Sequence, residues 1–112
     1  MNDIDDNDGH IVIRNGLEII AISRYHHITD KLIEMHNTIV SKKYRGKGVG
    51  RFLNQKLENY LRKQGVHKIQ STIYVDNLPS IVLKLKLGYL IEGLLRDHEE
   101  EGKHEYILGK VL

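Results

Sequence analysis

The chain has 112 residues, which suits a single domain with one modest core. Lys and Arg number 17 against 15 Asp and Glu, and this net charge of +2 does not by itself indicate a nucleic-acid-binding protein. The absence of cysteine excludes disulfides, thiolate nucleophiles and Cys-based zinc sites. The acidic N-terminus does not resemble a secretory signal, and no apolar run reaches the ~18 residues of a membrane span. We therefore expect a cytoplasmic globular protein.

The N-terminal region predicts an unstructured segment followed by strands. Residues 1–9 are acidic and polar, so we expect a flexible arm there and a single domain over residues 10–112. Short strands are predicted at residues 10–14 (HIVIR) and 17–27, because the second is rich in Ile and aromatic residues and an Asn-Gly turn separates them.

A third strand is predicted over residues 31–40, with the sequence KLIEMHNTIV. Side chains alternate between the two faces of a strand. One face should therefore carry Leu32, Glu34, His36 and Thr38, and the other Ile33, Met35, Asn37 and Ile39.

The remaining chain predicts two helices among three further strands. Apolar residues recur at helical spacing from Val49 to Leu61, and Gly65 follows as the expected end of the first helix. A strand is predicted at 67–75, and a short second helix should begin near Asn77 and end before Gly88.

Two last strands are predicted at residues 89–96 and 105–112, joined by a long polar loop over residues 97–104. The order is thus three strands, helix, strand, helix and two strands. This order favours an α+β fold with a mixed sheet, in which antiparallel strands lead into a β-α-β-α-β-β unit.

The most informative segment is the sequence RGKGVG at residues 45–50, between a strand and a helix. The glycine spacing fits neither a Walker A loop nor the dinucleotide fingerprint. Glycines nevertheless let a backbone approach a ligand closely, and the first N–H groups of a helix attract anions. Arg45, Lys47 and Arg51 add positive charge. On these residues alone, a plain turn before a helix remains an equal alternative.

The surrounding sequence strengthens the anion-binding interpretation. Val40 ends the preceding strand five residues before Arg45, and Arg45, Gly48 and Gly50 match the pattern [Q/R]-x-x-G-x-[G/A]. About 30 residues later, Asn77 follows a strand at the start of the second helix. Ser80 comes three residues after this Asn, and the helix ends in Leu87-Gly88-Tyr89.

Together these elements resemble the GNAT superfamily of N-acetyltransferases, and the resemblance covers about residues 31–112. It implies that acetyl-CoA is the co-substrate, with its pantetheine arm along the strand at Ile39 and Val40. A backbone N–H near Ile39 would polarise the acetyl carbonyl. The residues implied to hold the cofactor phosphates and the adjoining part of the site are Arg45, Gly46, Lys47, Gly48, Val49, Gly50, Arg51 and Asn77.

The resemblance also implies direct attack by an amine in a ternary complex, which requires a base and an acid. Glu34 lies eleven residues before Arg45, where some family members carry the base. His36 is a rival base on the same predicted face, since histidine titrates near neutrality. Lys84 stands where many members have a tyrosine that protonates the leaving thiolate, and Thr72 replaces the Glu or His base of other members. The Glu34 carboxylate and the His36 imidazole could instead belong to ordinary strand side chains.

The family usually begins with a strand and two helices, which wall one side of the acceptor site. Here about 30 residues precede the strand at 31–40, and they read as strands. We therefore expect a short, N-terminally trimmed member without that helix pair. Its acceptor side would be open or completed by a second copy in a homodimer. An open side suits a protein N-terminus or lysine better than a small amine.

Two alternatives to an enzyme come from other classes of function. A non-catalytic sensor or regulatory module that binds acetyl-CoA or CoA is the alternative, favoured by Lys84 and Thr72. Nucleic-acid binding is disfavoured because the basic stretch at 42–51 has little aromatic interleaving. No metal site is expected, since the seven histidines are scattered and none forms a helical pair of ligands.

Overall fold

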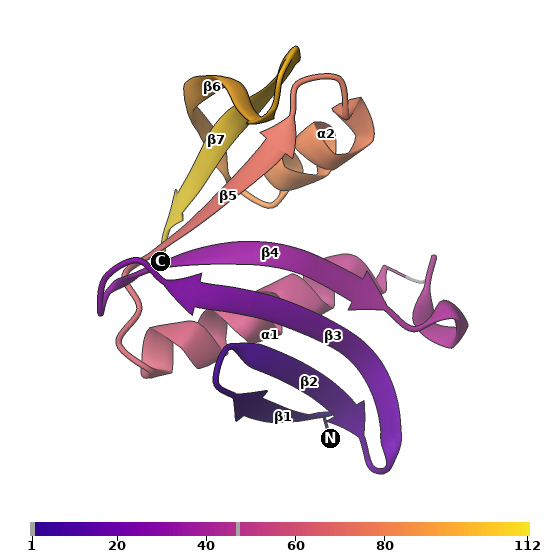
Figure 1. Cartoon of the computed structure of the whole chain (residues 1–112). Helices are drawn as coiled ribbons and strands as arrows, with labels where there is room; N and C mark the ends of the chain where they lie inside the picture. Colours follow the sequence, from indigo (N-terminus) through magenta and orange to yellow (C-terminus); the bar gives the residue numbers. More distant parts are fainter. Residues whose placement is uncertain (1, 47) are drawn as a thin grey trace.

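The computed structural model describes residues 2–46 and 48–112. Its elements form one mixed sheet with helices packed on it (Figure 1). In chain order they are β1 (Asn2–Asn7), β2 (His10–Asn15), β3 (Glu18–His27), β4 (Leu32–Val40), η1 (Lys42–Tyr44), α1 (Val49–Lys63), β5 (Lys68–Tyr74), α2 (Leu78–Lys86), β6 (Leu90–Glu100) and β7 (Lys103–Val111).

The sheet has seven strands in the order β1-β2-β3-β4-β5-β7-β6. Among the strands of the described residues only β4 and β5 run parallel, and α1 makes the crossover between them. The predicted mixed sheet is therefore confirmed. We call β1–β4 the first half-sheet and β5–β7 the second half-sheet; Figure 1 shows them diverging from the end where β4 begins. In the described part of the chain both α-helices follow β4, as the sequence predicted.

The two half-sheets meet over a short distance. Within the described residues, β4 and β5 pair only from Leu32–Glu34 to Lys68–Gln70. At the fork, the Ser71 hydroxyl donates a hydrogen bond to the carbonyl oxygen of Met35 at 3.1 Å. Beyond it, β4 continues paired with β3, and β5 continues paired with β7. A gap therefore opens inside the sheet.

A bulge in β4 lies beside this gap. Tyr25 pairs with Met35, but Ser23 pairs with Thr38, so β4 has one residue more than β3 over this stretch. The Ser23 hydroxyl lies 3.0 Å from Met35 Sδ and 2.9 Å from Thr38 Oγ1. Met35 and Thr38 therefore share a face. The prediction that Thr38 lies with Glu34 and His36 was wrong, because a bulge reverses the alternation of a strand.

The prediction of a flexible arm was also wrong for Asn2–Asn7, which form β1 and pair with β2. Ile4 packs against the core. Asp6 Oδ2 accepts hydrogen bonds from the hydroxyls of Tyr25 at 2.6 Å and Tyr60 at 2.9 Å. These bonds come from β3 and α1 and hold the acidic segment in the sheet. Such charge-assisted contacts stabilise by about 1.5–3 kcal/mol each.

The long loop predicted over residues 97–104 is absent as well. Strands β6 and β7 continue to Glu100 and Lys103, so only two residues form the turn. Asp97, with φ 49°, accepts a hydrogen bond from the Gly102 N–H at 2.6 Å, and its own N–H donates to His104 Nδ1 at 3.1 Å. These bonds hold an irregular but extended hairpin where the polar sequence indicated a loop.

The core lies between the sheet and the helices. Leu53, Leu57 and Leu61 recur every four residues along α1, face the sheet and are buried. They belong to one hydrophobic cluster that also contains Ile33 of the first half-sheet and Leu108 of the second half-sheet. Burying a leucine of this kind stabilises by about 1.5–3 kcal/mol. Neither helix in the described residues combines the length and apolarity needed to cross a membrane.

Candidate active site

The gap between β4 and β5 opens into a cleft of about 640 Å³. Its walls are the diverging strands, at residues 35–40 of β4 and 71–74 of β5, together with one side of each helix. The lining residues from the remaining elements are Gly50, Leu53, Asn54, Leu57, Asn77, Ser80, Leu83, Lys84, Leu87, Glu99 and Glu105. Ile39 and Val40, the predicted pantetheine-binding residues, are among the wall residues of β4.

The glycine-rich loop lies between the end of β4 and the start of α1. Gly46 and Gly48 have φ values of 74° and 70°, a conformation that L side chains rarely adopt. A Cβ atom added at either glycine would meet no atom within 4 Å, so the space beside this backbone is open. Arg45 Nε donates a hydrogen bond to the Val40 carbonyl at 2.8 Å, which ties the loop to β4. Lys47 lies outside the described residues.

Gly48 is the N-cap of α1, and the helix begins at Val49. Val49 packs against the core, Gly50 lines the cleft and Arg51 is exposed. No side chain caps this helix start, and its first turn carries no acidic residue. The N–H groups of a first helical turn have no intrahelical partner, so this end of α1 is suited to an anion such as a phosphate.

A second helix start lies across the cleft. Asn77 is the N-cap of α2, and its Oδ1 accepts a hydrogen bond from the Ser80 N–H at 3.4 Å. Lys84 follows on α2 with its Nζ 4.6 Å from the ring centroid of Tyr89. Burial lowers the pKa of Lys84, and the nearby Glu58 carboxylate opposes that shift. Burial also raises the pKa of Tyr89. A lysine whose pKa is lowered releases its proton more readily than an exposed one.

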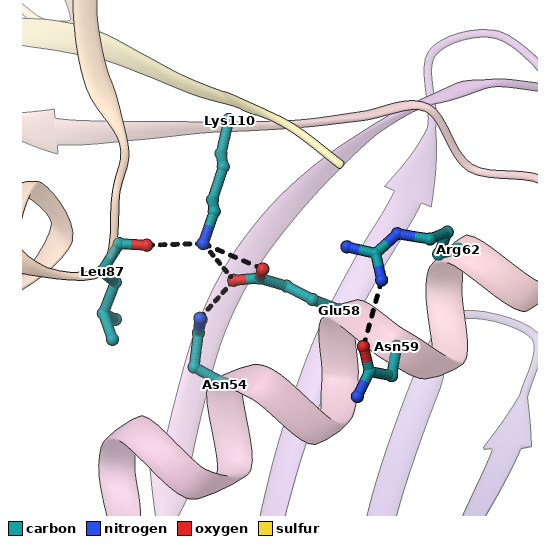
Figure 2. A network of polar contacts seen from close by, with 6 residues as sticks. All are labelled: Asn54, Glu58, Asn59, Arg62, Leu87 and Lys110. Atoms are coloured by element: carbon teal, nitrogen blue, oxygen red, sulfur yellow. Dashed lines mark hydrogen bonds and ion pairs between the residues drawn. The ribbon is translucent and has the colours of Figure 1, made fainter.

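A network of polar contacts connects α1 with β7 and the end of α2 (Figure 2). Glu58 of α1 is buried, and its carboxylate lies 2.9 Å from Lys110 Nζ of β7. The same Nζ donates to the carbonyl oxygen of Leu87, at the end of α2, at 2.5 Å. Asn54 donates to the other carboxylate oxygen of Glu58. This network joins α1 to β7 and to the end of α2.

The two predicted bases belong to a chain of three side chains on β3 and β4. Glu34 is half-buried and its Oε2 lies 3.5 Å from His26 Nε2. His26 Nδ1 lies 2.7 Å from His36 Nε2, and the two rings are stacked. Only His36 of these three lines the cleft. The predicted face shared by Glu34 and His36 agrees with this cluster, whereas His26 was not singled out from the sequence.

The ligand atoms of this cluster lie within 4.8 Å of one another. Two imidazoles and a carboxylate form a donor set that Zn²⁺ accepts, so these residues could hold a divalent ion. In the structure, however, the two imidazoles are hydrogen-bonded to each other. The arrangement is therefore also suited to proton transfer, because each ring nitrogen either donates or accepts depending on the tautomer.

A carboxylate that sequence reasoning missed lies on the second half-sheet. Glu105 of β7 is 2 % exposed, lines the cleft and pairs in register with Tyr74 of β5. Its Oε2 is buried and makes no hydrogen bond within the described residues. Strand alternation could have placed Glu105 on the same face as Ile107, but the sequence gives no sign that this part of the face is covered.

Residues 1–89 match the family model described as the acetyltransferase (GNAT) family. No curated protein sequence matches the chain significantly. Among solved structures, the ribosomal-protein-S18-alanine N-acetyltransferase of Escherichia coli is 19% identical, with a TM-score of 0.73 over 95% of this chain and 71% of that one.

Two further solved structures contain ligands. A GNAT acetyltransferase from Elizabethkingia anophelis with acetyl-CoA bound is 16% identical, with a TM-score of 0.77 over 92% of this chain and 75% of that one. Spermidine N-acetyltransferase from Vibrio cholerae, in complex with CoA and spermine, is 19% identical, with a TM-score of 0.76 over 91% of this chain and 64% of that one. At these identities the likeness concerns the fold.

Proposed function

The chain belongs to the acetyltransferase (GNAT) family, and on that premise we propose that it moves acetyl from acetyl-CoA to a primary amine. The amine attacks the thioester directly in a ternary complex. The acceptor is a protein or peptide N-terminus, a lysine side chain or a small amine. The observation that carries the proposal is the internal gap between β4 and β5, because the cleft it opens reaches from the glycine-rich loop to two groups able to move protons.

Acetyl-CoA fits the cleft in two respects. The phosphates would lie at the open backbone of Gly46 and Gly48 and at the start of α1, with Arg45 and Arg51 nearby. The pantetheine arm would pair with the exposed edge of β4 at Ile39 and Val40, in the manner of an added strand. The acetyl-CoA bound in the structurally similar Elizabethkingia anophelis protein supports this choice of co-substrate.

His36 is the proposed base, and the cluster on β3 and β4 supports the assignment. The Glu34 carboxylate can only accept a hydrogen bond, so it favours a proton on His26 Nε2. His26 Nδ1 then accepts from His36 Nε2, which leaves His36 Nδ1 free to take a proton. In this scheme His36 is the catalytic residue, while His26 and Glu34 are positioning residues.

Proton balance assigns the remaining role to Lys84. The acceptor ammonium first loses a proton to His36, and the free amine attacks the acetyl carbonyl. The tetrahedral intermediate expels the CoA thiolate and loses a second nitrogen proton, which returns through solvent to Lys84 after Lys84 has protonated the thiolate. Lys84 donates a proton to that thiolate, which its lowered pKa favours. The products are an amide, CoA and one proton released to solvent.

The first test is release of free CoA with a panel of amines and peptides, followed by a thiol reagent. We expect turnover in the wild type and a loss of about 100-fold in kcat for His36→Gln. His10→Gln, at an exposed residue of β2, is the matched control. Absence of transfer to every acceptor, despite tight binding of acetyl-CoA, would contradict the proposed activity.

Two expectations about the whole protein are part of the proposal. A second copy would complete the acceptor side, and Ile91 and Leu94 of β6, which share a face of the sheet, give that copy exposed apolar side chains to pack against. Light scattering of the purified protein tests the homodimer. The cytoplasm is the proposed location.

A further inference from the structure

Glu105 has an unusual environment for a carboxylate. It lies on β7 between Tyr74 of β5 and Leu95 of β6, and only 2 % of its surface is exposed. Its Oε2 has no hydrogen-bond partner among the described residues. A buried polar group without a partner costs free energy, and a buried charge costs more. Because Glu105 also lines the cleft, a cationic group entering the cleft would supply the partner.

The charged residues around Glu105 do not supply that cation. The Tyr74 hydroxyl donates to Glu99 and Glu100, each at 3.4 Å. Lys103 Nζ lies 3.3 Å from Glu100 and over the ring of Tyr74. Glu99 also lines the cleft and is exposed, so this end of the cleft carries negative charge. Such a field attracts cationic ligands.

The position of Glu105 separates it from the proposed base. Tyr74, its partner in register, lies four residues beyond Gln70, where pairing between β4 and β5 ends. Glu105 therefore lies on the second half-sheet at the wide end of the gap, whereas His36 lies on the first half-sheet. A carboxylate that binds an ammonium also stabilises its proton, which opposes attack by that same amine. The cation bound by Glu105 is thus better assigned to a different group.

We propose that Glu105 binds a cationic group of the acceptor that is separate from the amine that reacts, so that the acceptor carries at least two positive charges. An alkyl diamine or a peptide with a nearby lysine has this chemistry. The inference rests on the proposed function, since it concerns the acceptor of that reaction. Glu105 is a binding residue in this scheme, and His36 remains the base.

The test compares binding of 1,4-diaminobutane and butylamine by calorimetry, with CoA present so that no transfer occurs. We expect the wild type to bind the diamine at least about tenfold more tightly than the monoamine. Glu105→Gln, which removes the charge with little change in shape, should abolish that preference. Glu101→Gln, in the exposed turn outside the cleft, should keep it. Equal affinities in the wild type, or an unchanged preference in Glu105→Gln, would overturn the proposal.

A second measurement avoids dependence on the variant's folding. In wild-type protein labelled with ¹³C at glutamate carboxyls, 1,4-diaminobutane should shift the Glu105 resonance and leave that of Glu101 unchanged. A stationary Glu105 resonance at saturating diamine would also overturn the proposal. Transfer assays separate this inference from the proposed function: transfer with a diamine preference that does not depend on Glu105 contradicts only the inference. Binding that depends on Glu105, without transfer to any amine, contradicts only the activity.

Discussion

The two half-sheets differ in how the carboxylates of their acidic residues find hydrogen-bond partners. In the first, Asp6 accepts hydrogen bonds from two tyrosines and ties β1 to β3 and α1. In the second, Glu105 is more deeply buried than Asp6 and has a carboxylate oxygen without a hydrogen-bond partner among the described residues. Natural proteins satisfy almost all buried polar groups, so an exception at a cleft points to ligand binding. The comparison separates groups that hold the fold from groups reserved for a substrate.

The largest expected effect comes from breaking the buried network that joins α1 to the second half-sheet. Lys110→Met leaves the buried Glu58 carboxylate without its cation, and frees the carbonyl of Leu87 (Figure 2). Removing one partner of a buried ion pair should lower the free energy of unfolding by about 3 kcal/mol. Urea denaturation followed by circular dichroism measures this change.

Two further variants test the cause. Lys103→Met removes a lysine whose ion pair with Glu100 is exposed, so it should change stability by less than about 1 kcal/mol. The double variant Lys110→Met/Glu58→Leu removes both charges and should recover most of the lost stability. If Lys110→Met and Lys103→Met are equally stable, the buried network between α1 and the second half-sheet does not stabilise the fold.

An intermediate effect is expected at the glycine-rich loop that follows the first half-sheet. Glu at position 48 would point into open space, block close approach of the backbone and repel phosphate. Gly48→Glu should therefore weaken CoA binding by roughly tenfold or more, measured by calorimetry.

The control for this variant is Gly16→Glu, in the turn between β2 and β3. Gly16 also has a positive φ, 64°, and a Cβ there also meets no atom within 4 Å. Both substitutions carry the same backbone strain, of about 1–2 kcal/mol. Only Gly48→Glu should affect CoA, and equal affinity in the two variants would place the phosphates elsewhere.

The smallest effect should appear in the first half-sheet at alkaline pH. Burial and the hydrogen bond to Asp6 raise the pKa of Tyr60 to about 12, whereas an unfolded tyrosine titrates near ~10. Above pH ~10 the unfolded chain loses this proton before the folded protein does, so stability falls as pH rises towards about 12.

Tyr60→Phe should lose ~1 kcal/mol at neutral pH, because Tyr25 still donates to Asp6. It should also show a shallower loss of stability across the alkaline range. Urea midpoints between neutral pH and pH ~11 measure both. Tyr106→Phe, on β7, is the control, and an alkaline slope as steep in Tyr60→Phe as in this control would refute the role of Tyr60.

The sequence was most informative where local chemistry determines structure. The starts of both helices, α1 after Gly48 and α2 at Asn77, depend on residues close together in the sequence. Both helix starts were predicted. Strand β1 was missed because it is held in place by the hydrogen bond between Asp6 and Tyr60, which lie 54 residues apart in the sequence. The bulge in β4 and the burial of Glu105 were missed for the same reason, since neighbouring strands cause both.

The fork between β4 and β5 has a consequence for solubility. Most sheets expose two edges at their outer strands, but here the gap gives residues 35–40 and 71–74 two more edges inside the sheet. Unpaired edges are templates on which another extended chain can add and begin aggregation. The bulge in β4 and the helices beside the cleft restrict that access. These two features therefore limit pairing of the inner edges with another extended chain, while the cleft remains open to the proposed pantetheine arm.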